Sequence, residues 1–220
     1  MYNPIKRLID ILISLILIII LSPILLFTYL TIQMNSGRPI TFVQKRVKKN
    51  GKIFLIYKFR TMIEKASLFQ KKGFTDKELS TKEGWILRKL HFDELPQLFN
   101  IFKGDMSLIG PRPPTMKDYK HHLELDPNYK KIFSNKPGLI SLDGVLAYIN
   151  SKKRKKILNK LGLELSTVKN KHSKYSEEYH EKKKQREYYY LNNKSFILDL
   201  RIFLWTIVMF FDCCKRIFTK

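Results

Sequence analysis

The sequence predicts a mainly helical α+β fold, in which an N-terminal re-entrant membrane helix, a small β-hairpin and interfacial amphipathic helices surround a cytoplasmic domain. Three observations support this fold class: one long uncharged apolar run, two β-rich runs on either side of an Asn-Gly pair, and apolar residues at helical spacing in much of the remainder. A chain of 220 residues with 44% apolar residues suits one domain of ordinary size. We expect the membrane helix at residues 1–36, the cytoplasmic domain at 37–194 and a C-terminal amphipathic helix at 195–220.

The apolar run from Ile11 to Ile32 contains no charged residue and would extend roughly 33 Å as a helix at 1.5 Å per residue. Cations flank this run on both sides, so the positive-inside rule cannot choose an orientation. Ser22-Pro23 lies near its middle, where proline removes a backbone donor and can bend the helix back toward the face it entered. We favour a re-entrant helix, although an ordinary kinked span fits the same residues because membrane helices tolerate proline.

The formal net charge of +23 indicates an anionic partner, and nucleic acid, anionic lipid and a phosphorylated substrate all qualify. The apolar run favours lipid. A basic run from Lys152 to Arg186 is either a solvated segment or a surface that presses against anionic headgroups. It lacks the interleaved aromatic residues of a nucleic-acid platform, so we expect no nucleic-acid partner. The neighbouring Cys213 and Cys214 cannot form a disulfide framework, which agrees with a reducing compartment.

The β-rich runs Pro39 to Gln44 and Ile53 to Phe59 lie on either side of Asn50-Gly51, which is a strong hairpin signal. Strand alternation past the second run would place Lys58 and Arg60 on one side, where two cations could face one site. A solvated strand face is the simpler interpretation of these two residues taken alone.

Asp93-Glu94 opens an amphipathic run, so the two carboxylates are predicted at the beginning of a helix, where the helix dipole adds partial positive charge. Ahead of them, apolar spacing predicts a helix over Trp85 to Phe92, and Arg88 in that helix could hold a carboxylate or a phosphate. Downstream, a proline-stiffened turn from Gly110 to Pro113 presents Arg112. These residues could together serve metal, phosphate and nucleophile chemistry.

The last part of the chain contains two further candidates. His121-His122 with Glu124 could bind zinc, but a mostly solvated helix is the simpler interpretation. The segment from Phe196 to Phe211 is apolar apart from two early charges, and cations follow it. We interpret it as an interfacial amphipathic helix rather than a second membrane span.

Four strings occur in a specific order: Lys6-Arg7 with the Ser22-Pro23 break, Lys58-Phe59-Arg60-Thr61-Met62, Asp93-Glu94-Leu95-Pro96-Gln97-Leu98-Phe99-Asn100, and Gly104-Asp105-Met106-Ser107-Leu108-Ile109-Gly110-Pro111-Arg112-Pro113. Together they resemble the bacterial sugar transferases, and more fully the small monotopic polyprenyl-phosphate phosphoglycosyl transferases. The resemblance runs from about residue 4 to residue 116 and resumes at Ser195 to Ile202.

The resemblance implies transfer of a sugar-1-phosphate from a UDP-sugar to undecaprenyl phosphate, with release of UMP and a requirement for Mg²⁺. It implies that Asp93 is the nucleophile that forms a covalent phosphosugar intermediate, and that Glu94 supports metal and proton handling, so both carboxylates are the metal candidates. An N-acetylated sugar is the family's commonest choice. The substrate-binding residues carried over are Arg88, Arg112, Lys58, Arg60, Pro111 and Glu187.

The same resemblance implies the cytoplasmic face of a bacterial inner membrane, where the reaction would begin O-antigen, capsule or glycoprotein glycan synthesis. The expected partners are anionic phospholipid headgroups and downstream glycosyltransferases, and a homodimer is left open. Two features depart from the family. Glu187 stands where an Asp commonly precedes an aromatic pair, and Lys136 to Gly144 lacks the family's usual residues after Pro-Gly. A catalytically degenerate scaffold and a membrane-tethered basic protein are therefore the alternative functions.

Overall fold

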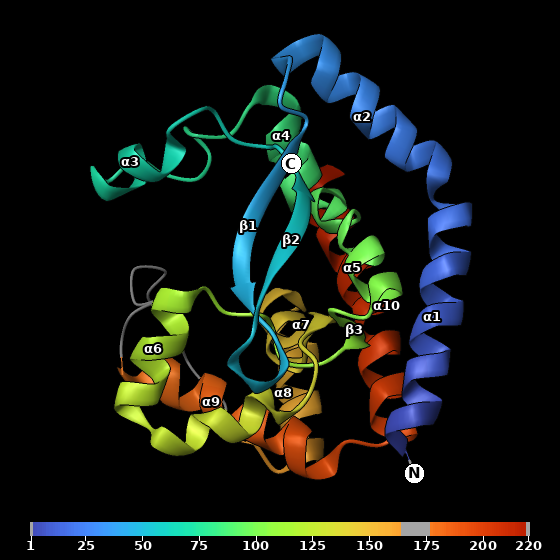
Figure 1. Cartoon of the computed structure of the whole chain (residues 1–220), viewed down its shortest axis with the longest axis vertical. Helices are drawn as coiled ribbons and strands as arrows, with labels where there is room; N and C mark the ends of the chain where they lie inside the picture. The colour runs from blue at the N-terminus through green and yellow to red at the C-terminus, as the bar shows by residue number, and fades with distance from the viewer. Residues whose placement is uncertain (1, 164–176, 219–220) are drawn as a thin grey trace.

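The computed structural model describes residues 2–163 and 177–218, and the part of the predicted basic run at 164–176 lies outside these residues. Within them the fold is mainly helical, with one two-stranded antiparallel hairpin and one short parallel strand pair. The predicted mainly helical fold with a small hairpin is therefore confirmed. In Figure 1 the first two helices run along one side of the molecule, and the hairpin stands nearer its middle.

The predicted membrane helix is broken. Helix α1 (Tyr2–Ile20) and helix α2 (Ser22–Ser36) meet at Leu21 with a bend of 59°. Pro23 lies in the first turn of α2 and has no N–H to donate back to Ile19, whose carbonyl accepts a 2.8 Å bond from the Ser22 hydroxyl instead. Among the helices that the structure describes, none alone is long and apolar enough to cross a bilayer, and only this bent pair passes by length and composition.

The hairpin forms as predicted, with β1 (Thr41–Val47) antiparallel to β2 (Ile53–Phe59). Its turn contains η1 (Lys49–Gly51), in which Asn50 and Gly51 both have left-handed φ values, 60° and 73°. These two residue types tolerate that conformation best. The first strand begins at Thr41 rather than at the predicted Pro39, which has no N–H for a ladder bond.

The carboxylate pair does not begin a helix, which corrects the prediction. After α3 (Ala66–Lys71) and α4 (Lys82–Lys89), residues Phe92–Glu94 form a separate 3₁₀ turn, η2, and helix α5 spans Gln97–Lys103. Pro96 separates the two because it cannot donate an N–H to the carbonyl of Phe92, so the α-helical bonds start only after it. The helix dipole therefore does not act at the carboxylates in the predicted manner.

Strands β3 (Ser107–Ile109) and β4 (Gly138–Ile140) pair in parallel at the centre of the domain. Between them lie α6 (Met116–Leu125) and η3 (Pro127–Ser134). A Cβ at Gly138 would lie 2.1 Å from the backbone nitrogen of Gly110, so only glycine permits this approach. This close approach packs the chain around residue 110 against Lys136 to Gly144, the segment that departs from the family pattern.

The remaining helices close the core. They are α7 (Leu142–Tyr148), α8 (Ser151–Leu161), α9 (Glu177–Asn193) and α10 (Phe196–Phe218). The largest buried cluster joins apolar residues from β2, α5, β3, α7, α8 and α10, and partly buried residues of α1 pack against it. Helix α1 is further tied to the domain by Asp10, which accepts bonds from the Ser107 hydroxyl at 2.7 Å and the Leu108 N–H at 3.0 Å.

Candidate active site

Of the two adjacent carboxylates, Asp93 is the one without a bonded partner in the described part of the chain. Its side chain lies in turn η2 and the residue is only 8% exposed, yet among the described residues it takes part in no hydrogen bond or ion pair. Burial, and then the neighbouring Glu94 carboxylate, raise its pKa to about 6, against the opposing effect of three nearby cations. Asp93 is therefore a buried, unpaired carboxylate that is ionised at neutral pH.

Glu94 is held by two cations. One of its oxygens accepts a 2.7 Å bond from Lys58 Nζ of β2 and a 2.6 Å bond from Arg112 Nη2. Burial alone would raise the pKa of Glu94, but Arg112 and Lys58 outweigh it and the pKa lies well below its usual range. The two adjacent carboxylates thus differ: the pKa of Asp93 is raised and the pKa of Glu94 is lowered.

The turn that presents Arg112 is fixed on both sides. The Pro111 carbonyl accepts a 2.9 Å bond from the N–H of Gly138, and Arg46 Nη1 donates to the Pro113 carbonyl at 3.0 Å. The side chain of Arg112 itself stays 48% exposed, so the guanidinium can contact both Glu94 and a bound ligand. Pro111 contributes its carbonyl to this turn.

The structure brings Lys58 and Arg112 to the pair, but three other predicted residues lie apart. Arg88 Nη2 pairs with Asp76 at 2.9 Å, although it is close enough to lower the pKa of Asp93. Arg60 donates to backbone carbonyls at the end of α2, including that of Gly37 at 2.8 Å. Arg60 thus joins the hairpin to α2 instead of facing Lys58.

Glu187 is the third predicted residue that lies apart from the carboxylate pair. It lies buried on α9, where it accepts a bond from the Tyr129 hydroxyl, and burial raises its pKa. No contact joins Glu187 to Asp93 or Glu94 within residues 2–163 and 177–218.

Two aromatic residues at the site were not predicted to act there. Tyr148, at the end of α7, packs edge-on against His91 with ring centroids 4.8 Å apart, and its pKa is raised by burial while Arg112 and Glu94 also act on it. His91 has a left-handed φ of 59° and a buried Nε2 without a hydrogen-bond partner in the described chain. No local pattern around Tyr148 could have identified it, because the fold of the chain through α7, not local sequence spacing, brings it against His91 beside the pair.

The donor set suits a magnesium ion that is shared with a substrate. Mg²⁺ keeps several waters and is commonly held by one or two carboxylates together with substrate phosphates. Asp93 and Glu94 supply two adjacent carboxylates, and Asp93 is otherwise unpaired. No group of three or more His, Cys, Asp or Glu residues that could hold a metal alone occurs in the described part of the chain, His121 and His122 included.

Comparison with known proteins places the site in a family. A family model described as bacterial sugar transferase matches residues 1–213. The chain is 46% identical over 113 residues to a UDP-N-acetylgalactosamine-undecaprenyl-phosphate N-acetylgalactosaminephosphotransferase of Aeromonas hydrophila, covering 51% of this chain and 27% of that protein. It is 45% identical over 116 residues to EpsL, an uncharacterized sugar transferase of Bacillus subtilis, covering 52% and 55%.

A third relative is the undecaprenyl-phosphate galactose phosphotransferase of Salmonella typhimurium, 33% identical over 153 residues, covering 62% of this chain and 31% of that protein. The chain thus spans from about a quarter to about half of the length of these relatives. The family match itself extends over nearly all of the chain and includes the carboxylate pair, both of its cations and the broken helix. This chain belongs to the bacterial sugar transferase family.

Proposed function

We propose that this chain transfers a sugar-1-phosphate from a UDP-sugar to undecaprenyl phosphate and releases UMP, which starts a glycan on its membrane carrier. Family membership and the names of the relatives support the general reaction. The observation that carries the catalytic assignment is the unequal state of the two carboxylates, because Glu94 is neutralised by Lys58 and Arg112 while Asp93 has no partner in the described structure.

Asp93 is the proposed nucleophile. One oxygen of its carboxylate attacks the β-phosphorus of the UDP-sugar, so that an acyl-phosphate bond forms, the phosphoanhydride bond breaks and UMP leaves. A phosphate oxygen of undecaprenyl phosphate then attacks the same phosphorus and displaces the Asp93 carboxylate. The products are UMP and undecaprenyl diphosphate sugar, and the enzyme returns to its starting state.

Lys58, Arg112 and Glu94 form the proposed phosphate site. A carboxylate that approaches a phosphodiester meets repulsion, which cations beside the phosphate oxygens reduce. Arg112 is half exposed and can reach a ligand, and Glu94 fixes its position through the 2.6 Å bond. A divalent cation bound by Asp93, Glu94 and the substrate phosphates would supply further neutralisation of phosphate charge.

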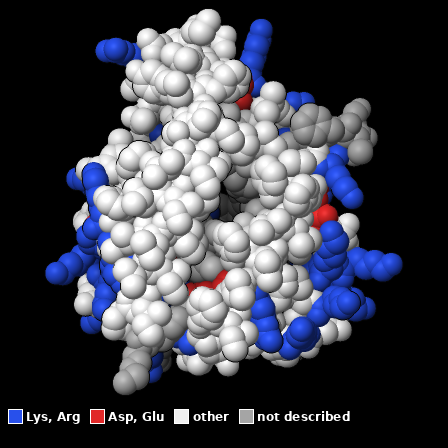
Figure 2. Space-filling view, turned by 90° about the vertical axis from the view of Figure 1, so that its right-hand side faces the viewer, with Lys and Arg blue, Asp and Glu red and all other residues white. Residues whose placement is uncertain are grey.

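We propose a monotopic position on the cytoplasmic leaflet. Figure 2 shows that the face carrying the first two helices is largely free of charged residues, with lysines and arginines around its margin. Large apolar side chains are exposed on α1, α2, α5 and α10, which supports insertion of this face into one leaflet. An apolar groove of about 460 Å³ lies between α2, β2 and α5 next to Pro96, and the polyprenyl tail is proposed to use it.

The decisive experiment measures UMP release by protein in nanodiscs with undecaprenyl phosphate, Mg²⁺ and a panel of UDP-sugars that includes N-acetylated and plain hexoses. We expect turnover of an N-acetylated sugar by wild type and at least a thousandfold loss in Asp93→Asn. Without acceptor, intact-mass measurement of acid-quenched wild type should show one added phosphosugar, and Asp93→Asn should show none. Folded wild type without turnover of any sugar would contradict the transferase proposal and favour the scaffold.

A further inference from the structure

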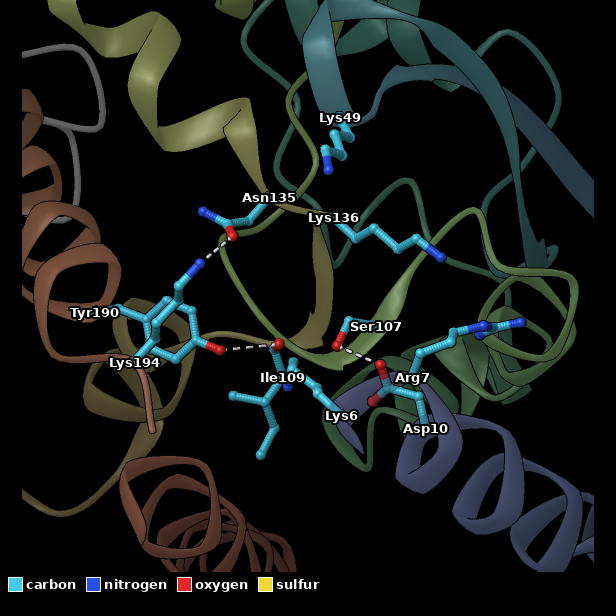
Figure 3. Close-up of a pocket in the computed structure, with 10 residues that line it drawn as sticks. All are labelled: Lys6, Arg7, Asp10, Lys49, Ser107, Ile109, Asn135, Lys136, Tyr190 and Lys194. Atoms are coloured by element: carbon cyan, nitrogen blue, oxygen red, sulfur yellow. Dashed lines mark hydrogen bonds between the residues drawn. The ribbon is translucent and has the colours of Figure 1, made fainter. Parts of the chain in front are cut away.

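A basic cavity lies away from the carboxylate pair, at the N-terminal end of α1. It has a volume of about 110 Å³ and is shown in Figure 3. Four separate parts of the chain supply its cations: the start of α1, the hairpin turn, the residues before β4 and the end of α9. These cations are Lys6, Arg7, Lys49, Lys136 and Lys194. None of them is a contact of Asp93 or Glu94.

Two of these lysines have no ion-pair partner among the described residues, although the Asp10 and Asp105 carboxylates lie near enough to Lys136 to favour its charged form. In the described parts of the chain, neither Lys49 nor Lys136 forms an ion pair with a carboxylate. Burial, and then the nearby Arg7, lower the pKa of Lys136. A partly buried ammonium group next to another cation raises the free energy of the folded chain unless an anion lies beside both.

The positions of the charged groups converge. A Cβ built on Gly104 would lie 3.1 Å from Arg7 Nη2 and 3.4 Å from Lys136 Nζ, so both groups flank one point of the backbone. In Figure 3 the Lys49 side chain reaches toward the cavity from the hairpin turn. A second hollow adjoins this one and shares Lys49 and Lys136 with it. These two lysines therefore stand at the junction of the two hollows.

The acidic and polar groups of the cavity are already occupied. Asp10 accepts from the Ser107 hydroxyl and the Leu108 N–H, and Asn135 accepts from Lys194 at 2.6 Å. The Tyr190 hydroxyl donates its one proton between Asp199 Oδ1 at 2.9 Å and the Ile109 carbonyl at 3.2 Å.

Lys6 pairs with Asp199, and Arg7 donates to the Ile101 and Phe102 carbonyls at 2.7 and 2.9 Å. Within the described residues, this leaves the ammonium groups of Lys49 and Lys136 as the cations of the cavity that have neither a hydrogen bond nor an ion pair.

We propose that this cavity binds one phosphate group, carried by the headgroup of an anionic phospholipid or free in solution. Phosphate offers several acceptor oxygens and its charge complements lysine and arginine donors. The volume of about 110 Å³ is well below the roughly 300–1,000 Å³ of sites that enclose whole drug-sized ligands, which favours a single small anion. The bound anion would join α1, the hairpin turn and the β4 segment. This site is separate from the proposed transfer reaction.

The test is thermal unfolding of the full chain in phosphatidylcholine nanodiscs, with inorganic phosphate titrated against chloride at constant ionic strength. A second arm replaces part of the lipid by phosphatidylglycerol and omits phosphate. The site variant is Lys49→Gln with Lys136→Gln. The matched control is Lys117→Gln with Lys120→Gln, which removes the same charge from exposed positions of α6, and Lys49→Arg with Lys136→Arg tests rescue.

We expect an anion-dependent rise in the unfolding temperature of wild type and of the α6 control, and at least a tenfold weaker apparent affinity in the Gln variant. The Arg variant should regain the response. In chloride alone the Gln variant should be at least as stable as wild type, since repulsion from Arg7 is relieved. A response in one arm identifies the source of the phosphate. No wild-type response in either arm, or equal responses of wild type and the Gln variant, would overturn the proposal. The readout requires no turnover.

Discussion

At the scale of single residues, the environment of Asp93 links protein stability to the proposed catalytic role of this carboxylate. Its raised pKa of about 6 means that the folded protein holds this proton more tightly than the unfolded chain, whose carboxyl has a pKa near 3.8. The contribution that tighter proton binding at Asp93 makes to the free energy of unfolding is therefore fully present below about pH 3.8. It is lost as the pH rises through about 6. At neutral pH the ionised, buried Asp93 carboxylate destabilises the fold.

Asp93→Asn should consequently be both inactive and more stable than wild type. Removing the buried charge is expected to raise the free energy of unfolding at pH 7.5 by about 1–3 kcal/mol. Denaturant unfolding at pH 7.5 and at pH 5 checks this, because the gain should shrink at the lower pH. A variant that is less stable than wild type at both pH values would show that Asp93 is not an unpaired buried charge.

The rate of UMP release should follow the ionisation of Asp93. A protonated carboxyl is not a nucleophile, so kcat/KM for the UDP-sugar, which reports the free enzyme, should fall about tenfold per pH unit below about pH 6. Bound metal and phosphate shift this value, so the profile is recorded at several Mg²⁺ concentrations. A pH-independent rate between pH 5 and pH 7 would argue against Asp93 as the attacking group.

Glu94→Gln should behave in the opposite way to Asp93→Asn. It leaves Lys58 buried without its carboxylate, and is expected to lower the free energy of unfolding by about 2–4 kcal/mol. Adding Lys58→Met should restore part of this loss, since the uncompensated charge is removed. If the double variant is no more stable than the single one, the ion pair is not the cause. Chemical unfolding of the three proteins decides this.

At the scale of elements, the parallel pair β3–β4 depends on glycine. Gly138→Ala would place a Cβ 2.1 Å from the Gly110 nitrogen and should cost about 3 kcal/mol or more in unfolding free energy, because the two strands must separate. Gly144→Ala is the control, since its Cβ would meet only a side-chain atom, the Ser141 hydroxyl at the N-cap of α7, at 2.9 Å. Equal effects of the two changes would contradict the proposed strand contact.

The connection of α1 to the domain also depends on one carboxylate. Asp10→Ala removes the acceptor of two buried donors, the Ser107 hydroxyl and the Leu108 N–H, and should cost about 2–3 kcal/mol. Ser14→Ala, which removes only a bond to the Ile11 carbonyl within α1, should cost much less. Unfolding in nanodiscs measures both. If the two variants are equally stable, Asp10 does not couple the helix to β3.

At the scale of the whole molecule, the proposed monotopic position depends on the bent pair α1–α2. A re-entrant arrangement places both ends of the pair on one side. Ile5→Cys and Met34→Cys, introduced separately after Cys213→Ala and Cys214→Ser, should react with an impermeant maleimide from the same side of sealed vesicles. Labelling of the two positions from opposite sides would show that the pair spans the bilayer. Pro23→Leu removes the cause of the bend and should increase the fraction of protein labelled from opposite sides.

The order of the elements was predictable from local patterns, and the departures have local causes. The hairpin followed from Asn50-Gly51 and the helix break from Pro23, because each acts on its own stretch of backbone. The helix predicted to begin at Asp93 begins only at Gln97, because Pro96 interrupts the hydrogen bonds. The chain between residues 136 and 150 has no clear period, and only its packing on β3 and α10 shows that it forms β4 and α7.

The sequence by itself determined the identity of the carboxylate pair, the order of the motifs and the family resemblance, since all of these are properties of contiguous residues. The tertiary structure alone decided that Lys58 and Arg112 share Glu94, that Arg88 and Arg60 are engaged elsewhere, that Tyr148 reaches the pair, and that four distant segments form one basic cavity. The physical reason is that charge pairing and burial depend on distances in space, which chain folding sets and no local spacing encodes.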